Sequence, residues 1–518
     1  MERQTKNRAA TILKNAVSNY VRQVIQIATF VVLTPFIIAK VGTEDFGLWS
    51  LIQATIGLLG LMDLGFSASV VKYVAEARGQ GDERRVGDLT ATFFWLYIVI
   101  GVVTAVLTLG LLPFLQPVFR VPDQHIATAR IVFLLIGLRS AQALPLGLFA
   151  GILVGYQRQT MSNITRTFGT LSYAVLAFWA LSWKPTLEVL AWVSLGTGVA
   201  ANVMSLAMCL KVAKGMSLAL RRFKRALLRE VSSFSIYFFL IQVSMLLATR
   251  IDTIITNAFL PLTAVALYTV AIRVAEKAGV LCRQLTNALT PLIAELKGAG
   301  EESNIRAVFR KGSMLSVAMA TPMIVGLFWI APQLLEVWMG EEFGEAATAC
   351  RLLLAAAMIG IVHANAENVL SMTGHQRFLA FTSIGAQVFN ITLTLILIRP
   401  MGINGVALAT LISAAIFQSG MILRKTSQLH KIGVFDFYRS ALWPSIPGAL
   451  LMLVGFWSLE RFLPPTSLLN IFVLELLVCL LFIPGFLLAL GKADRQYFLS
   501  RARKIFGRKR PGPEGGTA

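Results

Sequence analysis

Long apolar stretches recur along almost the whole chain, and short polar segments separate them. About 20 apolar residues suffice for a helix to cross the hydrocarbon core of a bilayer. Fourteen stretches meet this condition: 15–39, 46–71, 89–112, 126–154, 162–183, 187–210, 231–259, 262–294, 307–331, 346–372, 378–398, 404–423, 440–459 and 468–490. Backbone amides find no water inside a bilayer, so only helices or closed barrels span it, and these runs are too long for barrel strands. The pattern predicts an all-α integral membrane protein with about fourteen transmembrane helices.

The composition agrees with this pattern. Apolar residues make up 56% of the 518 residues and charged residues only 14%, whereas charged residues make up roughly 25% of an ordinary soluble protein. The first apolar span does not fit a cleavable signal peptide, because its apolar run is too long and no small-residue cleavage site follows it. The composition therefore excludes an ordinary soluble protein, and we expect a multi-pass protein.

The basic residues are distributed unevenly between the two sides of the predicted spans. Most of the 47 Lys and Arg lie at the N-terminus, in the loops after even-numbered spans and in the tail. The loops on the other side hold few of them: Lys40, Arg120, Lys184, Arg399 and Arg461. By the positive-inside rule, both termini are expected to be cytoplasmic. The net charge of +21 then reflects topology, so we expect no nucleic-acid partner.

Motifs for metal, nucleotide or nucleophile chemistry are not found in the sequence. The four cysteines stand singly in or beside apolar spans, which suits small buried side chains: Cys209, Cys282, Cys350 and Cys479. His363 and Glu367 share one helical face, but two ligands without a third are ordinarily a hydrogen-bonded polar pair. The sequence has no P-loop, GxSxG or HExxH. We therefore expect no metal, no cofactor and no nucleotide-driven step.

The sequence repeats itself after 219 residues. This shift aligns Gly60 with Gly279, AEARGQGDE (75–83) with AELKGAGEE (294–302), and GYQR (155–158) with GHQR (374–377). One period contains six spans, an even number, so the two copies keep the same orientation in the membrane. The repeat predicts two pseudo-symmetric six-helix lobes and two additional C-terminal helices. The expected parts are a cytoplasmic N-terminus (1–14), an N-lobe (15–210), a basic linker (211–230), a C-lobe (231–423), the last two spans with their loop (424–490) and a basic cytoplasmic tail (491–518).

The eighth span carries a stripe of charged and polar residues inside an apolar segment. Arg273, Glu276, Lys277 and Arg283 lie on one helical face, together with Gln284 and Asn287. A charge that faces lipid at the bilayer centre costs about 3 kcal/mol on insertion scales. The stripe is therefore expected to face a watery or protein-lined interior.

Further charges lie inside other spans. The candidate cations for ligand binding are Arg22, Arg139, Arg250, Arg273, Lys277 and Arg283, and the candidate acids for ion coupling are Asp63, Asp252, Glu276 and Glu367. Local pairing is the alternative for some of them, because buried charges generally need partners: Glu276 with Arg273 or Lys277, and Asp252 with Arg250. Arg22, Arg139 and Arg283 have no evident local partner, which makes them the better candidates for ligand contact.

Uncharged polar residues also occur within or beside the spans. They are Gln23, Gln53, Tyr73, Asn163, Gln242, Asn287, Asn365 and Asn368. A sugar chain would need such amides and hydroxyls, but residues of this kind more often form hydrogen bonds between helices.

The stretches NAVSNYVRQVIQIATFVVLTPFIIAKVGTEDFGLWSL and LMDLGFSASVVKYVAEA resemble the N-terminal signature of the polysaccharide transporters. These are the oligosaccharide flippases of the multidrug/oligosaccharidyl-lipid/polysaccharide exporter superfamily. The resemblance continues through GHQRF and GINGVALATLIS and covers about four fifths of the chain. It implies a flippase that moves an undecaprenyl-diphosphate-linked sugar unit from the inner to the outer face of the bacterial cytoplasmic membrane by alternating access. Arg139, Arg273, Lys277 and Arg283 would correspond by position to the family's cation-lined cavity.

The chemistry of the interior cations suits such a substrate, because guanidinium groups bind phosphate oxygens in a bidentate fashion and stay protonated when desolvated. The expected partners are the lipid-linked oligosaccharide, bilayer lipids and other polysaccharide assembly proteins. Two alternatives stay open. An antiporter of cationic drugs or small molecules would use an acid-dominated pocket. A membrane-embedded glycan polymerase or ligase would need a large outer loop, whereas the longest ones here, 332–345 and 113–125, are short. We therefore expect a transporter that is not an enzyme.

Overall fold

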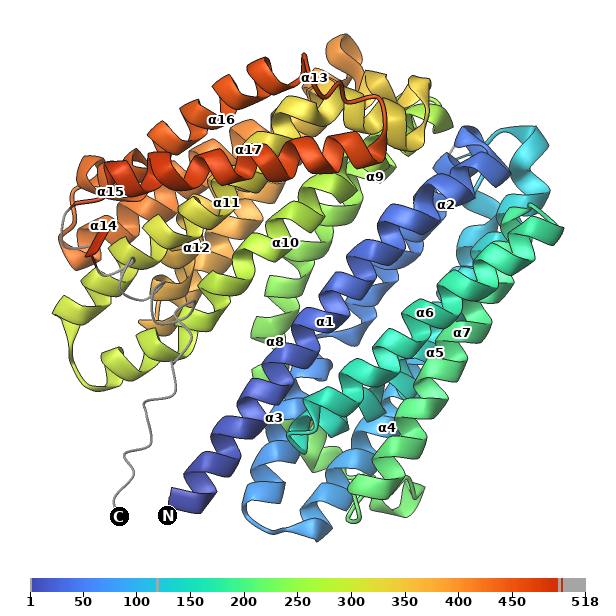
Figure 1. Ribbon diagram of the computed structural model, residues 1–518. Helices are drawn as coiled ribbons and strands as arrows, with labels where there is room; N and C mark the ends of the chain where they lie inside the picture. The colour runs from blue at the N-terminus through green and yellow to red at the C-terminus, as the bar shows by residue number, and fades with distance from the viewer. Residues whose placement is uncertain (1, 118–120, 492–494, 497–518) are drawn as a thin grey trace, which may run out of the picture. The chain divides into compact units, whose positions relative to one another are not determined.

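The computed structural model describes residues 2–117, 121–491 and 495–496, and within this part of the chain it is all helical (Figure 1). The α-helices are α1 (Glu2–Val41), α2 (Thr43–Leu58), α3 (Phe66–Gly79), α4 (Glu83–Leu111), α5 (Ile126–Gly155), α6 (Gln159–Trp183), α7 (Leu187–Val212), α8 (Arg225–Leu246), α9 (Asp252–Phe259), α10 (Leu262–Gly298), α11 (Glu302–Met339), α12 (Ala347–Met372), α13 (Gln376–Ala414), α14 (Arg424–His430), α15 (Val434–Ala441), α16 (Ile446–Leu459) and α17 (Leu468–Ala489). The predicted fold class, an all-α membrane protein, is confirmed.

The chain packs as two compact units. Unit 1 holds the chain up to Arg273 together with Ala380–Ser413, and unit 2 holds Val274–Leu379 and the chain from Ala414 onward. The helices α10 and α13 each contribute to both units. The predicted lobes at 15–210 and 231–423 follow the sequence repeat, and their boundaries stay a prediction.

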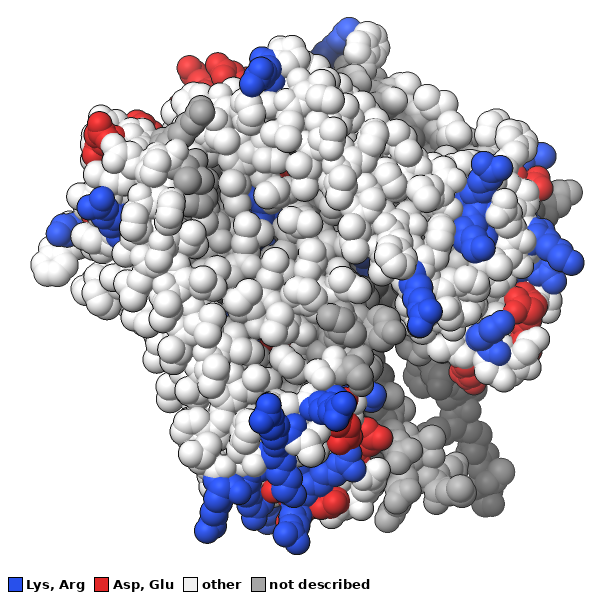
Figure 2. Space-filling view, turned by 180° about the vertical axis from the view of Figure 1, so that it is seen from behind, with Lys and Arg blue, Asp and Glu red and all other residues white. Residues whose placement is uncertain are grey.

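Ten helical segments in the described part of the chain are long and apolar enough to cross a membrane. Each of the fourteen apolar stretches contains helix, but the number of fourteen membrane crossings stays a prediction. The stretch 378–398 and the first half of 404–423 lie on α13, where Pro400 and the non-helical Gly402 (φ 57°, ψ −137°) separate them, and the second half of 404–423 is a π-helical segment, Ala415–Leu423. Figure 2 shows a surface largely free of charge between the charged ends of unit 1.

One predicted span, 46–71, is not a continuous helix. The helix α2 ends at Leu58, a 3₁₀ segment covers Leu59–Asp63, and α3 begins at Phe66. Leu64 and Gly65 lie between them with φ angles of 51° and 78°. This left-handed backbone suits glycine and cannot continue a right-handed helix. The apolar pattern did not show the break, because the residues around it are themselves apolar.

The polar loops of the sequence repeat have the same backbone in both copies. Gly81 and Gly300, which are 219 positions apart, have φ angles of 72° and 73°. Both loops also share three backbone hydrogen bonds, all between 3.0 and 3.1 Å. In the first loop they join Gln80 N to Glu76 O, Asp82 N to Ala77 O, and Val86 N to Asp82 O. In the second loop the equivalent bonds join Ala299 N to Glu295 O, Glu301 N to Leu296 O, and Ile305 N to Glu301 O. Glycine adopts this left-handed conformation without steric cost. The presence of a left-handed glycine at the same place in both loops supports duplication of this hairpin.

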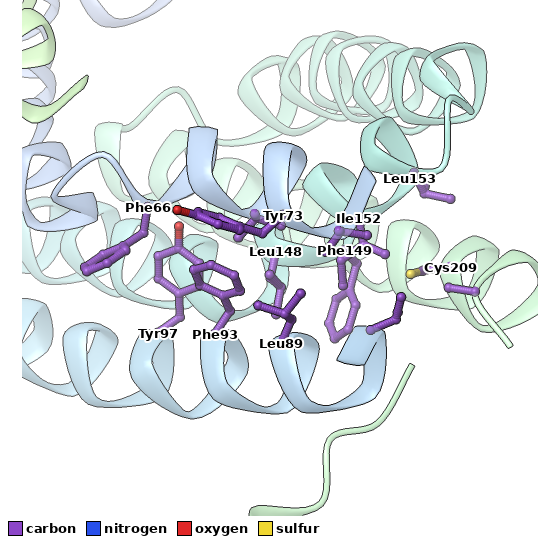
Figure 3. Packing of buried hydrophobic residues seen from close by; sticks show 14 of the residues in the cluster. Phe66, Tyr73, Leu89, Phe93, Tyr97, Leu148, Phe149, Ile152, Leu153 and Cys209 are labelled. Atoms are coloured by element: carbon purple, nitrogen blue, oxygen red, sulfur yellow. The ribbon is translucent and has the colours of Figure 1, made fainter. Parts of the chain in front are cut away.

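Buried side chains hold each unit together. In unit 1, Phe93 and Tyr97 of α4 point toward α3, and Phe149 of α5 lies beside them (Figure 3). In unit 2, one cluster surrounds Phe309 and Phe437, whose rings stack at 4.9 Å. Another cluster joins α16 and α17 to α11. Lipid is as apolar as these side chains, so close van der Waals packing rather than escape from water stabilises such contacts inside a bilayer.

Candidate functional site

The candidate cations and acids of the interior lie on different helices of the two units. Unit 1 holds Arg22 on α1, Asp63 after α2, Arg139 on α5, Arg250 just before α9, Asp252 at the start of α9, and Arg273 on α10. Unit 2 holds Glu276, Lys277 and Arg283 on α10 and Glu367 on α12. Only Asp63 and Asp252 are fully buried, and the others are partly exposed. A partly exposed charge within a membrane helix is a candidate for contact with a polar ligand.

Arg283 has an acidic partner on another helix, although its own helix offers no evident local one. Its Nη1 lies 3.7 Å from Oε2 of Glu367, on α12 of the same unit. The side chains remain 42% and 30% exposed, so the pair is open to solvent or a ligand. The ion pair is long for a charge-assisted hydrogen bond, which is typically about 2.7–2.9 Å. The arrangement leaves donors of Arg283 available for a second anion.

A glycine makes room for the Arg283 side chain. A Cβ on Gly360 of α12 would lie 2.7 Å from Nη2 of Arg283 and 3.7 Å from Oε1 of Gln418. This Gln418 oxygen is buried and has no hydrogen-bond partner. Since buried polar atoms are generally paired, the vacant acceptor beside the guanidinium marks this region of unit 2 as polar and incompletely satisfied.

Arg22 also has local partners, contrary to the prediction. It donates to Oε1 of Gln26 and to Oδ1 of Asn19, both at 3.0 Å and both on its own helix. Arg139 forms no ion pair with any residue that the structure describes. Its Nε lies 3.3 Å from the position that a Cβ on Gly198 would take. Of the three cations predicted to lack a local partner, Arg22 therefore has partners on its own helix, and Arg283 has one on a different helix.

Asp252 is the most deeply buried of the candidate acids, at 1% exposure. Its Oδ2 accepts hydrogen bonds from Tyr268 (3.0 Å) and Thr410 (3.3 Å). Its Oδ1 is buried and accepts no hydrogen bond of normal geometry, although the Asn390 side chain also interacts with this carboxyl group. The residue directly follows a π-helical segment, Leu247–Ile251, and such segments are frequent at functional sites. An isolated carboxylate inside a membrane must take up a proton or a cation, or be paired. The geometry of Asp252 therefore suits ion binding.

Asp63 has a structural role in the break between α2 and α3. Its carboxylate accepts from Tyr97 Oη and Ser67 Oγ, both at 2.7 Å, and from the Ser67 backbone N at 3.3 Å. These bonds satisfy the carboxylate and a free amide in the first turn of α3. The role as an ion-coupling acid stays a prediction that this geometry does not need.

Arg250, Arg273, Glu276 and Lys277 are partly buried, and none of them is a free charge. The predicted stripe on α10 also included Gln284 and Asn287, whose side chains lie outside the described part of the structure. Four of the predicted sugar-contacting residues instead form hydrogen bonds within a unit: Tyr73 to Glu230 O, Asn163 to Ser18, Asn365 to Ser316 and Asn368 to Thr286 O. Gln23, Gln53 and Gln242 are partly exposed.

His363 is fully engaged within unit 2. Its Nδ1 lies 2.7 Å from Ile359 O and its Nε2 lies 3.0 Å from Tyr438 Oη. No ring nitrogen remains for a metal beside Glu367, and the described residues contain no metal-binding group of three or more His, Cys, Asp or Glu. The two ring nitrogens of His363 therefore bond to Ile359 O and to Tyr438 rather than to Glu367, the partner that the sequence suggested.

The sequence did not indicate Tyr268, Thr410, Gly360 or Gln418 as parts of these sites. Tyr268 and Thr410 are ordinary helix residues in apolar segments, and Thr410 lies 158 positions from Asp252. A glycine or a hydroxyl in a membrane helix is common, so no local signal distinguishes these four. Their roles depend on which helices pack together.

Curated proteins with similar sequences are membrane proteins. The chain is 21% identical to the uncharacterized membrane protein EpsK of Bacillus subtilis over 74% of this chain and 76% of that protein. It is 24% identical to the probable low-salt glycan biosynthesis flippase Agl15 of Haloferax volcanii, over 32% of this chain and 35% of that protein.

Solved transporter structures share the fold. An inward-facing multidrug resistance MATE family transporter of the MOP superfamily superposes with a TM-score of 0.69 at 16% identity, covering 79% of this chain and 99% of that one. The lipid II flippase MurJ, in its inward closed conformation, gives 0.63 at 13% identity, with 90% and 97% covered.

Two family models match the sequence. The MatE model matches residues 238–396. The model described as polysaccharide biosynthesis protein matches residues 12–297, more than half of the chain, and therefore this protein belongs to the polysaccharide biosynthesis protein family.

Proposed function

We propose that the protein is a flippase that moves an undecaprenyl-diphosphate-linked oligosaccharide from the inner to the outer face of the bacterial cytoplasmic membrane, for polysaccharide biosynthesis. Family membership and the named flippases among its relatives and structural neighbours support a transporter. The observation that carries the proposal is the open ion pair of Arg283 and Glu367 within a membrane unit.

The proposed substrate explains why a charged pair lies between α10 and α12. A diphosphate cannot cross hydrocarbon without counter-charges, and arginine keeps its charge after desolvation. Arg283 is 42% exposed, so its remaining donors are accessible to phosphate oxygens. In this mechanism, the diphosphate takes the place of Glu367 as the partner of Arg283 during transport by alternating access. The partly buried Arg273 and Lys277 on the same helix add positive charge.

Asp252 is the proposed ion-coupling acid. A proton or a monovalent cation at its unpaired Oδ1 would neutralise the buried carboxylate, and Tyr268 and Thr410 would orient it through Oδ2. Loading and unloading this acid would bias α9 and α10 between two arrangements, which is how a bound ion shifts a conformational equilibrium.

A cation-coupled antiporter of drugs or small molecules is the second candidate. It is favoured by the match to the MatE model over residues 238–396, which include Asp252, Glu276 and Glu367. The family and the named relatives point to transport rather than to a glycan polymerase or ligase.

The function is tested by neutralising the three cations of α10 together. Arg273→Gln, Lys277→Gln and Arg283→Gln in one variant are expected to leave the folded protein in the membrane and to abolish delivery of lipid-linked sugar to the outer face. The measurement is the amount of outer-face sugar relative to protein abundance in membranes. Normal delivery by this variant would remove the proposed binding role, and export of a cationic drug without sugar delivery would favour the antiporter.

The location of the termini gives a separate prediction. We expect both termini and the linker 211–230 to lie in the cytoplasm. A reporter enzyme that works only in the cytoplasm should therefore be active when it is fused after Gly215 or Gly512, and a reporter that works only on the outer face should be inactive there. Reporters that are active only on the outer face would reverse the assigned orientation.

A further inference from the structure

A loop on one end of unit 1 is fixed to the start of α4. The Ser217 N and O both hydrogen-bond to Thr90 Oγ1 at 3.1 Å, and Lys224 N donates to Thr92 Oγ1 at 3.1 Å. Trp95 Nε1 donates to Leu218 O at 3.0 Å. These bonds hold the segment 213–224, which follows α7, at several points along its length. The segment is therefore held in a defined position in unit 1.

The fixed loop and the first turns of α4 line an open polar pocket of about 790 Å³. Its lining residues are Glu83, Arg84, Asp88, Lys214, Gly215, Met216, Ser217, Arg221, Arg222 and Lys224. Figure 2 shows Lys and Arg gathered, with few acids among them, over the end of unit 1 where α3, α4 and α7 turn. Cations outnumber acids in the lining by five to two, so the pocket attracts anions.

Most of the cations that line the pocket form no ion pair within the described part of the chain. The Lys224 ammonium forms an ion pair with Asp88. Arg84, Lys214, Arg221 and Arg222 form no ion pair with any residue in the described part of the chain. Several unpaired cations around one cavity are the arrangement that binds the oxygens of a phosphate group.

The same loop exposes apolar side chains next to its cations. Leu220 is 61% exposed and Phe223 is 36% exposed, and Arg221 and Arg222 lie between them. Alternation of basic and apolar residues at the end of membrane helices is typical of segments that lie in the headgroup region, with the apolar side chains in the acyl boundary. A site for a soluble phosphate compound would not need the apolar side chains, so this feature favours a lipid.

We infer that this pocket, which we call the loop pocket, binds the phosphate headgroup of an anionic phospholipid, with Lys214, Arg221 and Arg222 as the binding cations and Leu220 and Phe223 beside the acyl chains. The loop pocket is separate from the pair of Arg283 and Glu367, and this inference does not depend on the transported substrate. Lipid binding would anchor the linker between α7 and α8 to the membrane surface.

The test compares two double variants of the purified full-length protein in detergent. Lys214→Gln with Arg221→Gln removes two exposed cations from the loop pocket. The matched control, Arg225→Gln with Arg229→Gln, removes two exposed cations from the first turns of α8 that do not line the pocket. The probes are short-chain phosphatidylglycerol, short-chain phosphatidylcholine and inorganic phosphate, and the readout is the increase in Tm with probe concentration, because a ligand of the folded state raises its stability.

Phosphatidylglycerol is expected to raise Tm in a saturable way in the wild type and in the control, and phosphatidylcholine is not. In K214Q/R221Q the apparent Kd for phosphatidylglycerol should be roughly thirtyfold weaker, since each basic residue near an anionic lipid contributes about a factor of five. Equal losses in both double variants would show diffuse electrostatics and overturn the site. An equal effect of inorganic phosphate would overturn the lipid assignment. The Tm of each variant without probe reports whether it is folded. Native mass spectrometry of the wild type tests the inference without any variant, because the protein should retain phosphatidylglycerol in preference to phosphatidylcholine.

Discussion

Replacing Arg283 by glutamine is expected to reduce delivery of lipid-linked sugar to the outer face by about tenfold to a hundredfold, with nearly normal abundance of the protein. A hydrogen bond to a charged group contributes about 1.5–3 kcal/mol, and each 1.4 kcal/mol is a factor of ten. The fold should tolerate the change, because the Glu367 side chain is 30% exposed and can be hydrated when its partner is removed. The measurement is outer-face sugar per folded protein in membranes.

The ion pair makes a second variant necessary as a control. Since Arg283→Gln leaves Glu367 without its partner, a loss of delivery has two explanations. The double variant R283Q/E367Q removes both charges, and glutamine at both positions keeps the volume and the hydrogen-bonding capacity. If Arg283 binds the substrate, the double variant should stay as inactive as R283Q. Recovery of delivery in the double variant would show that the cation only neutralises Glu367.

Gly360 allows Arg283 to be displaced without changing its charge. A Cβ at this position would come within 2.7 Å of the guanidinium, and the far end of a flexible side chain can move away. Gly360→Ala is therefore expected to preserve stability and to lower delivery less than R283Q does. Unchanged delivery would mean that the position of the guanidinium is not important.

Replacing Asp252 by asparagine is expected to reduce ion-driven delivery at least tenfold, the second large effect. Asparagine can still accept hydrogen bonds from Tyr268 and Thr410, but it carries no charge and binds neither a proton nor a cation at the position of Oδ1. The folded protein should therefore persist. Delivery would be measured in membrane vesicles with and without an imposed gradient of protons or sodium ions, and the variant should lose the difference between the two conditions.

Two further variants separate coupling from structure. Asp252→Leu removes the acceptor of the hydrogen bonds that Tyr268 and Thr410 donate to Oδ2, and a hydrogen bond to a charged group contributes about 1.5–3 kcal/mol, so this variant should be less stable than D252N. Glu475→Gln is the matched control, because Glu475 on α17 is also an interior acid with an unpaired buried oxygen. If the response to the ion gradient disappears in E475Q and persists in D252N, then Glu475 rather than Asp252 is the coupling acid.

The sequence by itself determined the class of protein and the approximate positions of its helices. Apolar runs of membrane-spanning length need no tertiary information, because the bilayer accepts only helices or closed barrels. The cost of charges in lipid also led us to expect an interior position for the charged residues of α10, and this stays a prediction. The repeat also aligned the two polar loops that contain Gly81 and Gly300, and the structure adds that both glycines have a left-handed backbone.

Only the tertiary structure decided which of the interior charges are partners. The pairing of Arg283 with Glu367 and the bonds of Asp252 to Tyr268 and Thr410 join residues of different helices. The rotation of each helix and the choice of its neighbours fix such contacts, and helical periodicity shows neither. The break before α3 was hidden for a similar reason: Asp63 reads as an interior acid in the sequence, whereas hydrogen bonds from Ser67 and from Tyr97 of α4 make it part of a helix start. A sequence pattern places a charge on a helix face, but packing determines what that face meets.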